Sequence, residues 1–183
     1  MKKHHFYIIF FLLLCIINEG YSQGLQFYGN EKRISERSSF CVFTEKYLSV
    51  ATGTFTISFE YAAQNTESPG YIFYLKNADG QEAFNLTYVY DDSKGSFMFA
   101  QDGKQIYHAF PYPAAKLHAK WIPIIFKMDI PNDRINISIG NDQVTIEEIG
   151  LNKRTFTPQL FFGMCNYILE TALSLIHISE PTR

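Results

Sequence analysis

Histidine, cysteine and tryptophan are scarce in this sequence. Its 183 residues include five histidines, three cysteines and one tryptophan. His4, His5 and His177 lie close to the chain ends, which leaves His108 and His118 for any imidazole chemistry. No recognisable nucleophile elbow lies near either of them, and no cysteines or histidines have the spacing of zinc ligands. The sequence therefore predicts neither a catalytic triad nor a zinc site.

An excess of charge of one sign is also absent. The chain has 16 Lys and Arg residues against 18 Asp and Glu residues, a formal net charge of −2. Nucleic-acid-binding domains carry clustered basic residues, often with aromatic residues between them, and no such cluster occurs here. We therefore expect no nucleic-acid partner.

The N-terminus has the three parts of a secretory signal peptide. Two lysines precede an apolar stretch at residues 6–17, and small residues follow up to Ser22. The stretch is shorter than the roughly 20 residues that span a bilayer as a helix. We expect residues 1–22 to be removed between Ser22 and Gln23, which predicts a periplasmic, cell-surface or secreted protein. A retained membrane anchor is the alternative.

The C-terminal segment at residues 173–183, LSLIHISEPTR, resembles the in-frame translation of a common sequencing-library adaptor. Scars of this kind are left out of fold reasoning. We therefore expect one domain over residues 23–172 without its final strand, and a natural chain that continues past Ala172. The alternative is a natural β-strand followed by a tail that contains proline.

Alternation of apolar and polar residues is the main structural signal between these ends. Residues 55–61, FTISFEY, place an apolar or aromatic side chain at every second position, as a half-buried strand does. Further segments of high β propensity lie between turn residues, at 84–90, 97–99, 106–110, 124–130, 134–139, 144–146 and 160–165. Short strands at this spacing predict an all-β sandwich or barrel.

A family resemblance refines this prediction. It is carried in order by residues 24–29, 34–40, 54–60, 70–75, 118–126, 133–140 and 160–163. These segments resemble a laminin-G-like, concanavalin-A-type jelly roll found at the start of exported bacterial proteins, and the part around Trp121 is the most specific. The resemblance covers nearly all of residues 24–172 and implies a two-sheet antiparallel jelly-roll sandwich. It also implies binding of a carbohydrate or a protein, with or without calcium, and further domains downstream.

Two cysteines lie within the predicted domain, Cys41 in an early strand and Cys165 in the last one. An exported protein meets an oxidising compartment, and early and late strands of a jelly roll are often neighbours. A disulfide between Cys41 and Cys165 is one expectation. Two small buried apolar residues are the other.

The carboxylates do not form a recognisable catalytic pattern. A glycosidase holds two carboxylates about 5–10 Å apart, and lytic relatives of this fold carry a Glu-x-Asp-x-x-Glu strand motif that is absent here. The adjacent pairs Asp91-Asp92 and Glu147-Glu148 are interpreted as surface charge, because neighbouring strand residues face opposite sides. We therefore expect a protein that is not an enzyme.

Candidate binding residues come from the tyrosines and from the turn aspartates. Exposed tyrosines could form a platform on which a sugar stacks, and the candidates are Tyr88, Tyr90, Tyr107 and Tyr112. The alternative for each is a core or rim position. Calcium prefers oxygen ligands, and the candidates for a calcium site are Asp129, Asp133 and Asp142. Aspartate is also a common turn former, so no cofactor is required.

These observations predict a non-catalytic recognition or spacer module of a larger exported cell-envelope protein. Its expected partner is a glycan or a protein, together with downstream domains of the same natural chain. A purely structural sandwich that packs on a downstream domain is one alternative. A glycan hydrolase of the same fold is the other, and it would be recognised by glycan-degrading activity.

Overall fold

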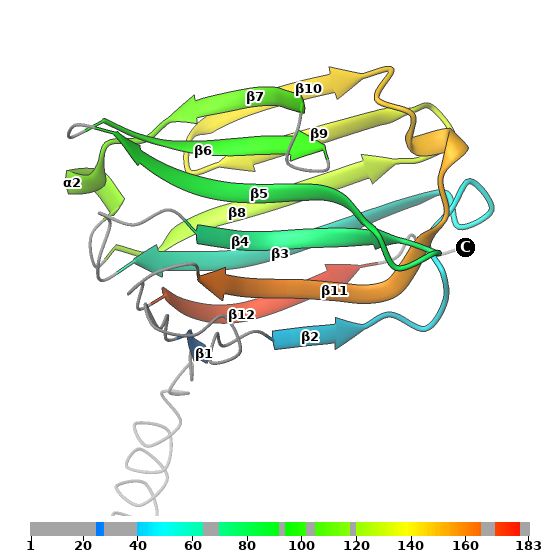
Figure 1. Cartoon of the computed structure of the whole chain (residues 1–183), viewed down its shortest axis with the longest axis horizontal. Coiled ribbons are helices and arrows are strands. Elements are labelled where there is room, and N and C mark those ends of the chain that lie inside the picture. The colour runs from blue at the N-terminus through cyan, green and yellow to red at the C-terminus, as the bar shows by residue number, and fades with distance from the viewer. Residues whose placement is uncertain are drawn as a thin grey trace, which may run out of the picture.

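The computed structural model describes residues 25–27, 40–63, 70–91, 94–101, 105–117, 120–165 and 171–179. These residues form two six-stranded sheets in which every paired strand is antiparallel to its neighbour. The sheets pack face to face, and Figure 1 looks onto the second of them. The all-β, two-sheet antiparallel sandwich predicted from the sequence is confirmed.

The two sheets draw their strands from the whole length of the described chain. The first sheet has the order β1 (Leu25–Phe27), β12 (Thr171–Ser179), β3 (Thr54–Ala63), β8 (Ile122–Asp129), β9 (Arg134–Ile139) and β10 (Asp142–Glu147). The second has the order β2 (Phe40–Phe43), β11 (Phe156–Cys165), β4 (Gly70–Asn77), β5 (Glu82–Asp91), β6 (Lys94–Gln101) and β7 (Gln105–Pro111). Two short helical turns connect strands, α2 (Ala114–Leu117) and the 3-10 turn η2 (Leu151–Lys153).

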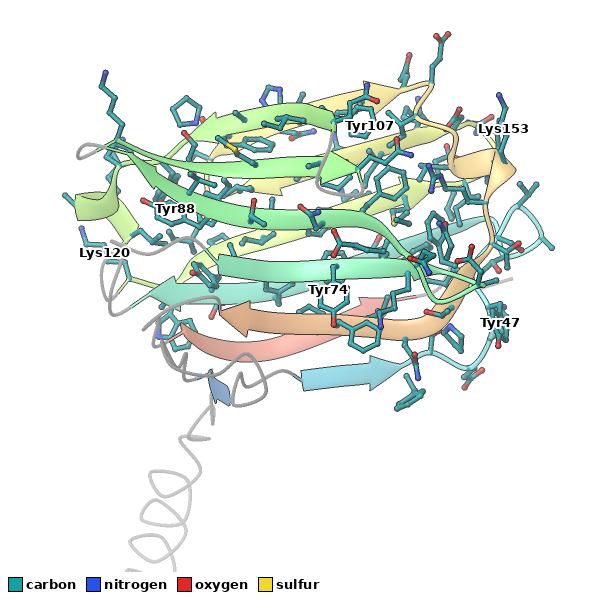
Figure 2. The ribbon with its side chains drawn as sticks, in the orientation of Figure 1. Tyr47, Tyr74, Tyr88, Tyr107, Lys120 and Lys153 are labelled. Carbon is teal, nitrogen blue, oxygen red and sulfur yellow. The ribbon has the colours of Figure 1, made fainter. Side chains whose placement is uncertain are left out.

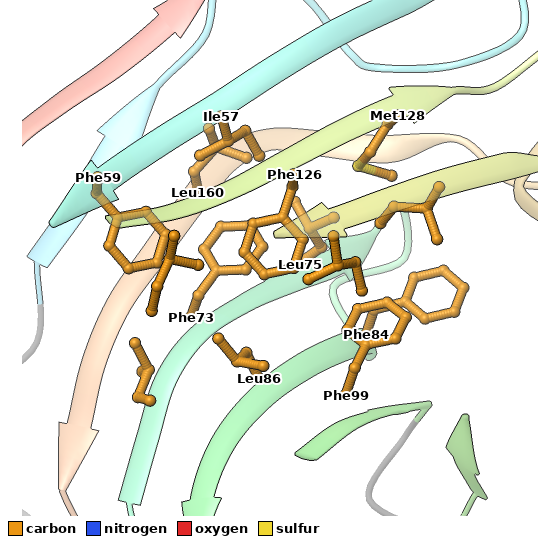
Figure 3. Close-up of a cluster of buried hydrophobic side chains, with 14 of the residues drawn as sticks. Ile57, Phe59, Phe73, Leu75, Phe84, Leu86, Phe99, Phe126, Met128 and Leu160 are labelled. Atoms are coloured by element: carbon orange, nitrogen blue, oxygen red, sulfur yellow. The ribbon is translucent and has the colours of Figure 1, made fainter. Parts of the chain in front are cut away.

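The core consists of aromatic and branched side chains that alternate along the strands. In β9, Ile135, Ile137 and Ile139 are buried while the residues between them are not, which is the pattern expected of a half-buried strand. Aromatic rings join the two sheets, as Figure 3 shows. The ring centroids of Phe73 and Phe126, which come from opposite sheets, lie 5.0 Å apart. Such pairs contribute more than their buried area alone.

The end of the chain differs from the sequence-based expectation. β12 pairs with β1 on one side and with β3 on the other, so it fills the place where a missing final strand would leave a gap. Most of β12 lies within residues 173–183, which we expected to stand outside the domain. A strand at this place satisfies backbone donors and acceptors that β1 and β3 would otherwise expose. That these residues derive from an adaptor stays a prediction.

The two cysteines of the domain lie on neighbouring strands, but not side by side. β2 pairs with β11, as expected, and this register sets Cys41 opposite Phe161. Cys165 lies four residues farther along β11, roughly 13 Å away at the usual rise of a strand. A disulfide joins Cα atoms that are about 4.4–6.8 Å apart. This register therefore does not support the bridge, and the two side chains lie outside the described set.

The aromatic contact between the sheets should dominate stability. Replacement of Phe126 by alanine removes a fully buried ring that contacts Phe59, Phe73 and Phe99. We expect Phe126→Ala to lower the free energy of unfolding by about 3–5 kcal/mol, as measured by urea denaturation. The neighbouring Lys127 is exposed, so Lys127→Ala should change it by no more than about 0.5 kcal/mol. Similar losses in both variants would contradict the assigned faces of β8.

Candidate functional site

A polar cleft opens where the β6–β7 hairpin of the second sheet faces the loops of the first. Its volume is about 620 Å³. The residues that line it are Gln101, Gln105, Tyr107, Asp133, Glu148, Ile149, Gly150, Asn152 and Lys153. In Figure 2, the labelled Tyr107 and Lys153 mark its two sides, one on the hairpin and the other on η2. The cleft is therefore assembled from three segments that are far apart in the sequence.

A β-bulge places the aromatic residue of this cleft. Phe99 pairs with His108 and Ala100 pairs with Ile106, so Tyr107 is the extra residue of β7. Its ring packs near Phe84 and Phe99, with centroid distances of 6.1 and 6.0 Å. Its hydroxyl donates a hydrogen bond to Oε1 of Gln101. Bulges often redirect a side chain in this way, and here the bulge joins Tyr107 and Gln101 into one wall of the cleft.

Asp133 holds the opposite wall together. Its carboxylate accepts hydrogen bonds from the backbone N–H of Gly150 at 3.1 Å and from that of Leu151 at 2.6 Å. Its backbone carbonyl accepts a third, from the N–H of Glu148 at 3.0 Å. These three bonds tie the turn between β8 and β9 to the loop between β10 and η2. The shape of this wall therefore depends on a single aspartate.

Backbone strain is concentrated at the same wall. Within the described ranges, the non-glycine residues with a positive φ are Asp133, at 50°, and Glu148, at 60°. Both line the cleft. Left-handed conformations are unfavourable for residues with a side chain, and they persist where the surrounding structure enforces them, often at functional sites. The strain identifies this cleft as the leading candidate for a functional site.

Of the candidate tyrosines whose side chains the structure describes, Tyr88, Tyr107 and Tyr112, it brings Tyr107 alone to the cleft. Tyr88 is fully buried, which makes it a core residue, and its hydroxyl donates to the backbone carbonyl of Tyr112 at 3.1 Å. Gly95 is required beside this bond, because a Cβ there would clash with the Tyr88 hydroxyl and lie 2.6 Å from the Tyr112 carbonyl oxygen. The side chain of Tyr90 lies outside the described set. Of the two interpretations of Tyr88, a binding residue or a core position, its burial supports the core position.

Tyr112 is half-buried at a different place from the cleft. Its ring packs edge-on against Phe97, with centroids 5.5 Å apart, and its hydroxyl lies close to Gly140 in the β9–β10 turn. Burial, and secondly the charge of Asp142, raise the pKa of Tyr112 above its ordinary value. Tyr112 therefore remains protonated at neutral pH and stabilises the contact between the sheets at this turn.

The three candidate calcium ligands are not brought together. Asp129 ends β8 and pairs with Arg134, the first residue of β9, and Asp133 lies just before that residue. Asp142 follows the other end of β9, roughly 20 Å away. Asp129 instead accepts hydrogen bonds from Asn132 at 2.9 Å and from Arg134 at 3.0 Å. Among the described residues, no group of three or more His, Cys, Asp and Glu side chains could hold a metal ion.

Most residues of the cleft gave no signal in the sequence. Glu148 was interpreted as surface charge, and it is exposed, yet it also lines the cleft. The amides Gln101, Gln105 and Asn152 belong to ordinary turn-flanking segments. Apart from Tyr107 and Asp133, the one usable signal was Gly150, which indicates a turn but not what the turn meets.

Comparison with known proteins places the fold. No protein-family model matches the chain, and no curated protein matches it. The chain is similar to the crystal structure of an alginate lyase from Pseudomonas aeruginosa, with a TM-score of 0.59 and 10% identity over 80% of this chain and 70% of the lyase. It is also similar to the binding domain of botulinum neurotoxin DC, solved in complex with rat synaptotagmin II, with a TM-score of 0.61 and 16% identity.

The likeness to the neurotoxin domain covers 91% of this chain but only 41% of that domain. A third similar structure is the CBM2 module of the evolved Dit of Lactobacillus casei BL23 phage J-1, with a TM-score of 0.54 and 12% identity over 76% of this chain and 66% of that one. At these identities the likenesses show the jelly-roll sandwich fold alone. The same architecture thus occurs in lyases and in binding domains.

Where the structure describes the chain, it contains no helix that is long and apolar enough to cross a membrane.

The turn held by Asp129 should make stability depend on pH in the acid range. Hydrogen bonds from Asn132, and secondly the bond and the charge of Arg134, hold the pKa of Asp129 below its ordinary value, although burial opposes them. A lowered pKa in the folded state gives stability that is present above the unfolded pKa of about 3.9 and is lost as the pH falls through the folded pKa.

We therefore expect Asp129→Asn to lower the thermal midpoint at about pH 7 but to have little effect near pH 2, where the wild-type carboxyl is protonated. Thermal unfolding at several pH values measures this difference. Asp142→Asn, in the turn beyond the other end of β9, controls for the loss of one charge. An Asp129→Asn effect of the same size at both pH values would contradict the assigned role.

Proposed function

We propose that this chain is a glycan-recognition module of an exported protein, and that the cleft binds a sugar chain without cleaving it. The observation that carries this proposal is the composition of the cleft. Three carboxamides, from Gln101, Gln105 and Asn152, share it with the Tyr107 side chain and with charged groups.

The chemistry of these side chains suits sugar hydroxyls. A hydroxyl both donates and accepts a hydrogen bond, and a carboxamide offers an NH2 donor and a carbonyl acceptor at adjacent positions. The volume of about 620 Å³ falls within the range of small-molecule sites, and it accommodates a few sugar units. The Tyr107 bulge and the bonds of Asp133 preform both walls, so binding costs little ordering of the protein.

Two observations favour binding over hydrolysis. The carboxylates among the described residues that line the cleft are those of Asp133 and Glu148, and Asp133 is already engaged by two backbone N–H groups. A glycosidase needs one carboxyl as acid and a second as nucleophile or base, both free to reach the scissile bond. The imidazole of His108 packs edge-on against Phe110, with centroids 4.5 Å apart, which supports a structural role. The alginate lyases among the similar structures make an activity assay a necessary control.

The exported location belongs to the same proposal. It is supported by the charged, apolar and small-residue segments of positions 1–22, which lie outside the described residues.

A second role as a spacer that packs on a neighbouring domain is favoured by one surface segment. Phe43, Tyr47 and Val50 are 69%, 55% and 45% exposed within eight residues of sequence, which is unusual for a surface that contacts only water.

The proposal predicts a glycan ligand that is lost on mutation of the cleft. We expect the chain to bind at least one oligosaccharide on a glycan array, and Gln105→Ala and Asn152→Ala each to weaken that binding about tenfold in calorimetry, because each removes one or two hydrogen bonds. Gln143→Ala replaces an exposed amide near the start of β10, away from the cleft, and should leave affinity unchanged.

Three outcomes would overturn the proposal. The first is the absence of binding to any glycan. The second is release of shortened sugar chains, which would make the chain an enzyme. The third is loss of binding in Phe43→Ser with full binding in both cleft variants, which would move the site to the exposed apolar segment.

A further inference from the structure

We propose that the cleft selects uncharged glycans and discriminates against glycans made of uronic acids. This inference rests on the proposed function and adds the chemical class of the ligand. The charged groups among the described residues that line the cleft are Asp133, Glu148 and Lys153.

These three charges are not equally available to a ligand. The carboxylate oxygens of Asp133 accept the N–H groups of Gly150 and Leu151, so this charge is already compensated by backbone donors. Glu148 and Lys153 carry opposite charges on the same loop and turn. Among the described residues that line the cleft, the ligand therefore meets the charges of Glu148 and Lys153, together with neutral amides and a phenol.

An acidic ligand would need cations in the cleft. Carboxylate ligands are best held by arginine, whose planar guanidinium donates two parallel hydrogen bonds. Arg154 is next to Lys153, but its guanidinium lies 5.0 Å from the ring centroid of Phe84 and donates to Oδ1 of Asn77 at 3.3 Å. It is thus committed to packing on the second sheet and does not line the cleft. Lys153 is the single cation among the described residues that line it.

Acidic and neutral sugar chains differ in how they meet the charges of the cleft. A uronic acid polymer carries a carboxylate on each sugar unit, so a chain of several units cannot place all of them beside Lys153. A carboxylate elsewhere along the cleft gains no lysine and is repelled by Glu148. Repulsion at a few ångströms in a water-exposed site weakens binding about fivefold for each such contact. A neutral chain of the same length carries no carboxylate that Glu148 could repel, and its hydroxyls form hydrogen bonds with the carboxamides.

The experiment compares neutral hexasaccharides of glucose, xylose and mannose with alginate hexasaccharides, using the full chain and calorimetry. We expect a neutral ligand to bind with an affinity that is the same in low salt and in about 0.3 M salt. We expect alginate oligomers to bind at least about fivefold more weakly in low salt. Glu148→Gln should raise the affinity for alginate, relative to that for the neutral ligand, about fivefold.

Glu147→Gln is the matched control, because Glu147 is the exposed neighbour of Glu148 and does not line the cleft. It should change neither affinity. Alginate binding that is tighter than neutral binding and is lost in high salt would overturn this inference and leave glycan recognition in place. An equal response of Glu147→Gln and Glu148→Gln would also overturn it, because the effect would then be general surface charge. Absence of binding to both ligand classes and on the glycan array would instead overturn the proposed function itself.

Discussion

The packing of aromatic rings between the two sheets is the constraint on which the rest of this structure depends. Phe59 and Phe126 of the first sheet meet Phe73 and Phe162 of the second, with centroid distances across the sandwich of 5.0 Å and 5.1 Å. A sheet with one apolar face is stable only when that face is covered, so these contacts determine that the two sheets associate and where their edges meet. The cleft lies at such an edge, beyond the buried rings of Phe84 and Phe99.

The cleft also shows how a stable core supports local strain. Asp133 and Glu148 have left-handed backbones that are unfavourable in isolation. They are retained because Asp133 makes hydrogen bonds to Glu148, Gly150 and Leu151, and Leu151, the first residue of η2, is buried in the core. Rigid walls of this kind position polar side chains before a ligand arrives, which is an advantage for recognition of flexible sugars.

The similar structures illustrate why the fold does not identify the function. A lyase, a neurotoxin binding domain and a carbohydrate-binding module share this architecture with the chain at 10–16% identity. What differs among proteins of one fold is the set of side chains at the site. Among the described residues, that set contains three amides, a tyrosine, two carboxylates and one cation, a composition that supports the proposal of a neutral ligand.

The sequence by itself determined the strands and the sandwich, because apolar residues at every second position report burial of one face, and this pattern is local. Residues 134–139 were predicted as a strand with the bounds that β9 has. The sequence also indicated Tyr107 and Asp133 as residues of interest. Only the tertiary structure decided that these two residues share a cleft. The bulge at Tyr107, the bonds from Gly150 and Leu151 to Asp133, and the register that separates Cys41 from Cys165 all depend on contacts between segments far apart in the chain. No local pattern records which distant loop a turn will meet, since that follows from how the two sheets pack.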